Sequence, residues 1–307
     1  MNTRDPLPTI PAQEYPERWA SVQRMMEQHG LELVLAYADD RATFGPAHAR
    51  WLADFPVHFE PVCILISRRG DPVMLCGPES DQYALLAGQI PDVRVLQAFT
   101  HPDEDYPYSN IQSLSEILPD VVHDLRLVRK VGIAGQGLMG SDILSAFRET
   151  LDVQWVDIEN AMCDLRAVKS PSEIDVIRYA YKIAESGLVA GVNAIQVGVT
   201  EREVAAEAEA AMRRAGAEGT GIDTIVASGP NSRPILARST FRRVRAERYC
   251  QMLWIGTPSV ASISGMSMNN SSDSRSHCSI SASPSGNSTP ALTRATRCGA
   301  LTRRQRR

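Results

Sequence analysis

The sequence predicts an α/β domain, then a segment of mixed helix and strand, and finally a stretch without regular structure. Over about the first 150 residues, apolar runs typical of buried strands alternate with amphipathic helical patterns. After residue 165, two helical patterns and a strand follow in the order typical of an α+β domain. After Val244 the periodic pattern ends, and thirteen serines fall within residues 259–290. Such a segment has too little apolar surface to offset the entropy of ordering.

The elements of the first domain follow from hydrophobic spacing. Tyr15, Trp19, Val22 and Met26 lie at helical spacing, and Gly30 stands where a helix would end. The apolar runs on either side of the sequence Arg-Arg-Gly-Asp at 68–71 predict a hairpin. In order, we expect strands at 31–37, 61–67 and 72–76, a helix at 80–88, a strand at 93–99, a helix at 111–118, a strand at 130–134, a helix at 141–151 and a strand at 153–156.

The second segment has clear helix-start signals. Ser170 is followed by proline and, three residues on, by Glu173, which predicts a capping box at the start of a helix that continues toward residue 195. Thr200 and Glu203 predict a second box, and Gly216 ends that helix. A run of high β-propensity at 222–228 predicts a strand that leads into a Gly-Pro-Asn turn.

Composition excludes several classes of protein. No apolar run is long enough for a membrane span, and the amino terminus lacks an apolar signal segment, so we expect a cytoplasmic protein. The six cysteines form no Cys-x-x-Cys pair, which argues against a zinc knuckle or a disulfide framework. The histidines lack metal-site spacing. His29 is expected at a helix carboxyl end, and the others in loops or at the surface.

Gly135, Gly137 and Gly140 form a Gly-x-Gly-x-x-Gly pattern between a predicted strand and a predicted helix. In dinucleotide-binding proteins, such glycines let a pyrophosphate approach a helix amino terminus. Asp157, at the end of the next strand, stands near the place of the ribose-binding acid. No second βαβ half follows, so a glycine-rich turn without a ligand is the alternative interpretation.

Three motifs after residue 165 carry a family resemblance. They are Leu-Arg-x-Val-Lys-Ser-Pro-x-Glu-Ile at 165–174, Gly-Val-Thr-Glu-x-Glu-Val at 198–204 with Gly-Ala at 216–217, and Ile-Val-Ala-Ser-Gly-Pro-Asn-Ser at 225–232. In this order and spacing they resemble the creatinase/aminopeptidase P/prolidase family of metallopeptidases, which has the pita-bread fold. The preceding α/β region is similar to the smaller amino-terminal domain of that family.

The resemblance divides the chain into four parts. We expect an amino-terminal extension at 1–13, a creatinase-like α/β domain at 14–160, an incomplete α+β pita-bread domain at 165–246, and an aberrant, disordered tail at 247–307. Members of the family usually hydrolyse a peptide bond next to proline with two divalent metals, such as manganese, cobalt or zinc. The metals are held by two Asp, one His and two Glu.

This chain departs from the family pattern where the metal ligands are expected. Pro234-Ile235 replaces the usual Pro-His pair, and residues 251–256 contain no carboxylate. After Glu247, the sequence offers Asp273 and His277 as its only acid and histidine. Two hard cations need several anionic oxygen ligands. We therefore expect no metal cofactor in this chain and an inactive relative of Xaa-Pro aminopeptidase or creatinase.

The candidates for a substrate pocket, from this resemblance, are Ser228, Asn231 and Arg238; no catalytic residue is assigned. A peptide or small-molecule substrate is expected for intact relatives. Two other functions stay open: a non-enzymatic dimerisation or binding module in the amino-terminal domain, and a dinucleotide-binding protein built on Gly135–Gly140. A homodimer is expected, with neither nucleic acid nor membrane as partner.

The charge distribution has an unusual break. The chain carries −4 in total, yet residues 242–307 contain eleven arginines, no lysine and two acidic residues. A basic tail commonly indicates nucleic-acid binding. With 29 arginines and three lysines the gene is expected to be GC-rich, and GC-rich codons translated out of frame yield Arg, Ser, Thr, Pro and Ala with few acids. We therefore expect that the residues after about Ala246 are out of frame.

Overall fold

The computed structural model describes residues 7–122, 124–233, 238–244 and 252–256. The chain divides into two compact units, and each is described by itself. One unit is Pro8–Val176, and the other holds the described residues from Ile177 onward together with Leu7. None of the helices in the described part of the chain is both long and apolar enough to span a membrane.

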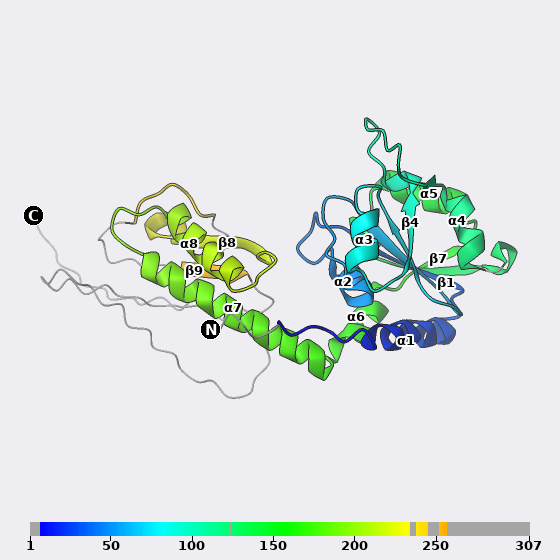
Figure 1. The fold of residues 1–307 in the computed structure, drawn as a ribbon, viewed down its shortest axis with the longest axis horizontal. Coiled ribbons are helices and arrows are strands. Elements are labelled where there is room, and N and C mark those ends of the chain that lie inside the picture. The colour runs from blue at the N-terminus through cyan, green and yellow to red at the C-terminus, as the bar shows by residue number, and fades with distance from the viewer. Residues whose placement is uncertain (1–6, 123, 234–237, 245–251, 257–307) are drawn as a thin grey trace, which may run out of the picture. The chain divides into compact units, whose positions relative to one another are not determined.

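A seven-stranded mixed sheet forms the centre of the Pro8–Val176 unit (Figure 1). Its strand order is β5-β4-β3-β2-β1-β6-β7. Strand β2 pairs antiparallel with β1 and β3, and the other neighbours are parallel. The strands are β1 (Leu33–Ala38), β2 (Val62–Ser67), β3 (Val73–Cys76), β4 (Asp92–Leu96), β5 (Ile111–Gln112), β6 (Lys130–Ala134) and β7 (Gln154–Asp157).

Helices cover both faces of this sheet. One apolar core is shared with α1 (Glu14–His29), α2 (Ala47–Ala53), α3 (Asp81–Ala87) and α6 (Glu159–Ala167). The other core is shared with α4 (Leu114–Val121) and α5 (Ser141–Thr150), and it includes Phe99 in the 3₁₀ turn η1 (Gln97–Phe99). Further 3₁₀ turns are η2 (Leu125–Leu127) and η3 (Gln136–Leu138).

Strand β1 shows why an unbroken apolar run marks a central strand. Its six residues are all buried, and alternate side chains enter opposite cores. Val34 and Ala36 belong to one core, whereas Leu35 and Tyr37 belong to the other. This two-sided burial confirms the predicted α/β layering of the first domain.

The local sequence patterns predicted most of these helices and strands, but not all of them. Helices α2 and α6 were not predicted, because α2 is rich in alanine and α6 buries little apolar surface. The segment predicted as a helix at 111–118 begins with strand β5, and the helix starts only after Ser113. The strand predicted at 93–99 ends at Leu96 and continues as η1.

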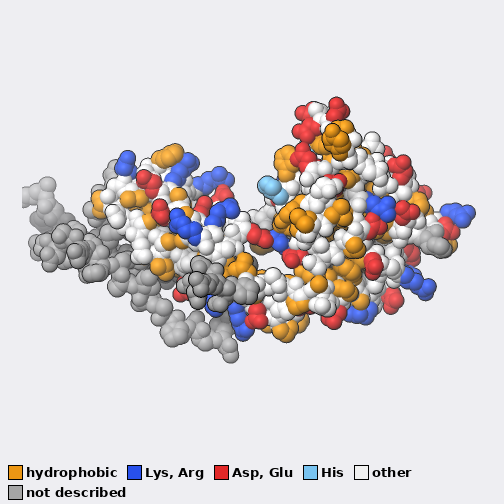
Figure 2. Space-filling model, viewed as in Figure 1, with side chains coloured by type: hydrophobic (Ala, Val, Ile, Leu, Met, Phe, Trp, Pro, Cys, Tyr) orange, Lys and Arg blue, Asp and Glu red, His pale blue; other side chains and the backbone are white. Residues whose placement is uncertain are grey.

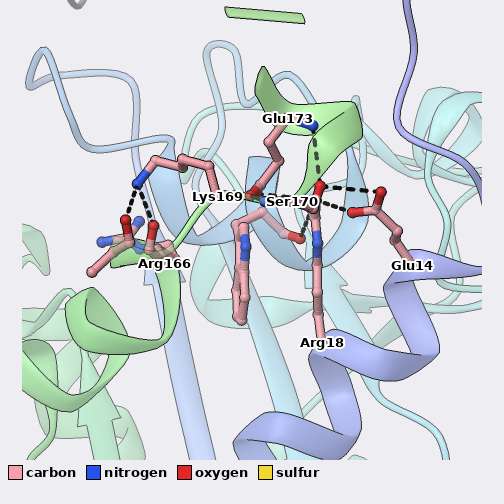
Figure 3. Close-up of polar contacts among 8 residues, drawn as sticks. Glu14, Arg18, Arg166, Lys169, Ser170 and Glu173 are labelled. Carbon is pink, nitrogen blue, oxygen red and sulfur yellow. Dashed lines mark hydrogen bonds and ion pairs between the residues drawn. The ribbon is translucent and has the colours of Figure 1, made fainter. Parts of the chain in front are cut away.

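The first turn of helix α7 (Pro171–Ala194) is joined to α1 by a cluster of polar side chains (Figure 3). The guanidinium of Arg18 donates to Glu14 and Glu173, each at 3.1 Å, and to the carbonyl oxygen of Trp51 at 2.8 Å. The predicted capping box forms, since Ser170 N–H donates to the Glu173 carboxylate at 2.8 Å and Glu173 N–H donates to Ser170 Oγ at 3.1 Å. The start of α7 is therefore fixed within this unit.

The second unit contains the remainder of α7, α8 (Glu201–Arg214), β8 (Ile222–Ala227), the 3₁₀ turn η4 (Gly229–Ser232) and β9 (Met252–Gly256). Gly187 of α7 lets α8 approach closely, since an added Cβ would lie 2.5 Å from Met212 Cγ and 3.0 Å from the Ala208 carbonyl oxygen. Buried side chains of α7 and α8 and Val226 of β8 form the core of this unit.

Strand β9 pairs antiparallel with β8. It lies in the segment 247–307, for which composition predicted no regular structure, so that prediction is wrong for Met252–Gly256. These five residues include a run of β-favouring apolar types that a neighbouring strand can pair with. The predicted disordered tail at 257–307 lies outside the described residues, as do Pro234-Ile235.

Candidate functional site

Two of the predicted pocket residues converge on one buried carboxylate. Glu201, the first residue of α8, is fully buried. Its Oε1 accepts hydrogen bonds from Ser228 N–H at 2.7 Å and Ser228 Oγ at 2.8 Å. Its Oε2 accepts from Asn231 Nδ2 at 2.8 Å, Thr240 N–H at 3.0 Å and Thr240 Oγ1 at 2.6 Å. Glu201 thus joins the start of α8 to the turn after β8 and to residues 238–244. We call residues 238–244 the returning chain, because they pair with the segment at the start of α8.

Backbone pairing places this carboxylate. Thr200 caps α8 with the predicted box, in which Glu203 N–H donates to Thr200 Oγ1 at 3.2 Å. The returning chain runs beside residues 198–202, where Glu201 N–H donates to the Arg242 carbonyl at 3.0 Å. Ser239 Oγ links this chain to β8, because it accepts from Val226 N–H at 2.8 Å and donates to the Thr224 carbonyl at 2.9 Å.

The surroundings of Glu201 favour its charged form. Burial acts to raise its pKa, but hydrogen bonds from Thr240 and Ser228 outweigh burial and hold the pKa below its usual range. The amino end of α8 adds a favourable dipole. Five accepted hydrogen bonds exceed the roughly four lone-pair positions of a carboxylate. Glu201 is therefore saturated, and its role is to position the turn rather than to exchange a proton.

The three predicted pocket residues take different places around this carboxylate. The Ser228 and Asn231 side chains point to Glu201, and Asn231 Nδ2 also donates to the Arg238 carbonyl at 3.0 Å. The side chain of Arg238 is exposed, so Arg238 joins this cluster through its backbone. Sequence reasoning missed Glu201, because an acidic residue directly after an N-cap is ordinarily a solvated group that complements the helix dipole.

Charged side chains of both signs lie on the surface around this cluster. Figure 2 shows Lys and Arg side chains, with Asp and Glu among them, over the part of the chain that contains α8. The guanidinium of Arg202 lies over the ring of Phe241 at 4.2 Å, and Arg243 donates to the Gly198 carbonyl at 2.6 Å. These contacts stabilise the returning chain against the start of α8.

A metal centre needs several ligating side chains close together. Among them, no group of three or more His, Cys, Asp or Glu side chains could hold a metal ion. Glu201 is saturated by hydrogen bonds, and Asp223 of β8 belongs to no such group among the described residues. The described residues therefore do not fit the dinuclear centre that the family resemblance implies.

The glycine pattern at 135–140 has a structural explanation. Gly135 has a φ of 77°, and an added Cβ would lie 2.3 Å from the Tyr37 carbonyl oxygen. Its N–H donates to the Glu159 carboxylate at 2.7 Å, where a dinucleotide protein would present it to phosphate. Asp157 accepts the N–H of Glu159 at 2.9 Å at the start of α6. These contacts do not support the dinucleotide hypothesis.

The position of His48 contradicts another prediction from the sequence. It was expected in a loop or at the surface, but it lies in α2 and is 3% exposed. Its Nε2 lies 3.1 Å from the Glu159 carboxylate, and its Nδ1 has no hydrogen-bond partner within the described part of the chain. Burial lowers the pKa of His48, against the opposing effect of Glu159. A buried neutral imidazole therefore joins α2 to α6.

The fold is shared with solved peptidases. X-Pro aminopeptidase from Thermotoga maritima matches with a TM-score of 0.63 and 21% identity, covering 83% of this chain and 66% of that one. Prolidase from Pyrococcus horikoshii matches with a TM-score of 0.61 and 20% identity, covering 78% of this chain and 60% of that one. At these identities the likeness defines a class of fold: the chain has a prolidase and aminopeptidase P-type fold.

Sequence comparison gives the family. Residues 175–251 match the model of metallopeptidase family M24. Xaa-Pro dipeptidase of Pyrococcus furiosus is 34% identical over 114 residues, which are 37% of this chain and 32% of that protein. These matches support a relationship of residues 175–251 to metallopeptidase family M24, in the creatinase/prolidase group. The match spans about a third of the length of this relative.

Proposed function

We propose that this chain derives from a peptidase-type hydrolase of the Xaa-Pro dipeptidase or aminopeptidase kind. The match of residues 175–251 to family M24 carries the proposal, since it includes β8, η4 and the Glu201 cluster. The similarity to Xaa-Pro dipeptidases supports a substrate with proline after its first residue. Ser228, Asn231 and Arg238 are proposed to flank the substrate pocket of an intact relative.

The chain with this sequence is proposed to be inactive as a metallopeptidase. In the family, two divalent metals would activate a water molecule for attack on the peptide bond. The described residues do not fit such a centre, and the sequence after Glu247 offers a single carboxylic acid, Asp273.

The test is hydrolysis of a Xaa-Pro dipeptide by the purified full chain with added manganese, cobalt or zinc. We expect no release of the first residue above the rate with buffer alone. Metal-dependent turnover that a chelator abolishes would overturn the proposed inactivity and leave the substrate proposal standing. Turnover of a dipeptide without proline, with none of the Xaa-Pro dipeptide, would overturn the substrate proposal.

The reading-frame proposal has its own test, which is to resequence the gene across the codons for residues 242–265. We expect a single-base insertion or deletion, after whose correction the translation regains carboxylates and histidines. An unchanged frame would overturn this proposal.

The non-enzymatic alternative concerns the first unit. Its two apolar cores lie on the two faces of one sheet, which supports independent folding of a binding or dimerisation module. A homodimer is proposed for the full chain, and light scattering during size exclusion tests it. A monomer at micromolar concentration would contradict it.

A further inference from the structure

A groove of about 320 Å³ lies in the Pro8–Val176 unit, apart from the Glu201 cluster. It is bordered by η1, the first turn of α4 and the last turn of α5. Leu96, Leu114 and Phe147 form an apolar floor, and they are 2%, 6% and 1% exposed. Ligand sites are commonly about 300–1,000 Å³ in volume and largely preformed. The groove therefore has the size and firm floor of a site for a small molecule.

The groove borders the carboxyl ends of two neighbouring parallel strands. Leu96 is the last residue of β4, which is parallel to β3 and β5. Ser113, in the wall of the groove, directly follows the end of β5. The groove thus lies outside the carboxyl ends of two neighbouring parallel strands.

The charges at the groove select a cation. Glu149 lines it from the last turn of α5, where exposed carbonyl groups already make the helix end negative. The negative end of the helix dipole repels an acid at this position, so Glu149 lowers the stability of the helix. The facing amino end of α4 is occupied by Glu116, whose carboxylate accepts from Ser113 N–H and Ser113 Oγ, each at 2.7 Å. An anionic ligand in the groove would meet the Glu149 carboxylate, and Glu116 already takes the Ser113 donors.

We propose that this groove binds a small primary ammonium ion that carries a short apolar chain. The ammonium group pairs with the exposed Glu149 carboxylate at the rim, and the chain packs on Leu96, Leu114 and Phe147. Both parts are needed, because a single exposed ion pair in water contributes little affinity. The proposal is independent of the peptidase proposal, since no residue of the Glu201 cluster takes part.

The test is an NMR titration of the isotope-labelled full chain with n-butylammonium chloride at constant ionic strength. We expect saturable shift changes confined to the amides of residues 96–98, 113–115 and 146–150, with a millimolar dissociation constant. In Glu149→Gln the affinity should fall about two- to fivefold, because an exposed ion pair is lost. Glu27→Gln, an exposed acid on α1, is the matched control and should bind as the unchanged chain.

Two further measurements keep the charge and the cavity separate. 1-Butanol has the same chain without the charge and should bind about two- to fivefold more weakly. Ala146→Met, which fills the groove from α5, should abolish the localised shifts while the rest of the spectrum stays folded. Absence of saturable shifts, equal binding of 1-butanol, or undiminished binding by either groove variant would overturn the proposal.

Discussion

The carboxylate of Glu201 shows how one buried charge can organise a turn. Five hydrogen bonds from three residues replace the water that it loses on folding. A buried charge that is fully hydrogen-bonded is tolerated, but removing it leaves its donors unpaired. Ser228, Asn231 and Thr240 would then lack their common acceptor, although the backbone of β8 would be unchanged.

Replacing Glu201 should therefore destabilise the second unit. We expect Glu201→Ala to lower its free energy of unfolding by about 3 kcal/mol, whereas Glu207→Gln, an exposed acid on the same helix, should have little effect. Urea unfolding followed by hydrogen exchange at residues 226–233 is the measurement. Equal stability of the two variants would show that the hydrogen bonds to Glu201 are unimportant.

His48 gives the first unit a dependence on pH. Burial holds the His48 pKa below its usual value, whereas the unfolded chain takes up a proton near pH 6.5. Unfolding below that pH is coupled to proton uptake, so the stability contribution is present at neutral pH and decreases as the pH falls. The slope from this one group is at most about 1.4 kcal/mol per pH unit.

The effect of His48 can be separated from that of the other histidines. The decrease in stability between pH 7.5 and 5 should be smaller in His48→Leu than in the unchanged chain. His29→Gln, an exposed control at the end of α1, should keep the original dependence. Parallel curves for all three proteins in chemical unfolding would refute the assignment.

At the scale of elements, close approach of α7 and α8 depends on a missing side chain. A methyl group at Gly187 would lie 2.5 Å from Met212 Cγ and 3.0 Å from the Ala208 carbonyl oxygen. Alanine favours a helix by about 1 kcal/mol over glycine, but overpacking commonly costs about 1–3 kcal/mol. We expect a net loss of about 1 kcal/mol for Gly187→Ala, measured by thermal unfolding.

A loop glycine serves as a control for the effect of replacing glycine where there is no close packing. Gly219→Ala has open space around its Cβ position and should leave the unfolding temperature almost unchanged. A higher unfolding temperature for Gly187→Ala would mean that the helices separate without cost.

The same elements show what local sequence can and cannot predict. Capping boxes at Ser170 and Thr200 were predicted because their chemistry lies within four residues. The partners of Glu201 lie 27–39 residues away, and those of Arg18 up to 155, so no local pattern reveals them. Helix α2 was missed because alanine carries little hydrophobic periodicity, and the burial of His48 was missed with it.

At the scale of the whole molecule, the chain has the fold of these peptidases, but its described residues do not provide a fitting set of metal ligands. The match to the M24 family model and the α/β layering follow from motifs and apolar runs that this chain retains. The dinuclear centre needs ligands from several strands, and the described residues do not supply a set of three. Ser228 and Asn231 were predicted from the turn sequence, but their orientation toward Glu201 depends on tertiary pairing.

The metal content of the purified full chain tests the central claim most directly. The chain would be incubated with manganese, cobalt or zinc, exchanged into metal-free buffer and examined by elemental mass spectrometry. The absence of a fitting donor set predicts far less than one tightly bound metal per chain. Two tightly bound metals per chain would contradict this prediction and show that this sequence assembles the family's catalytic centre.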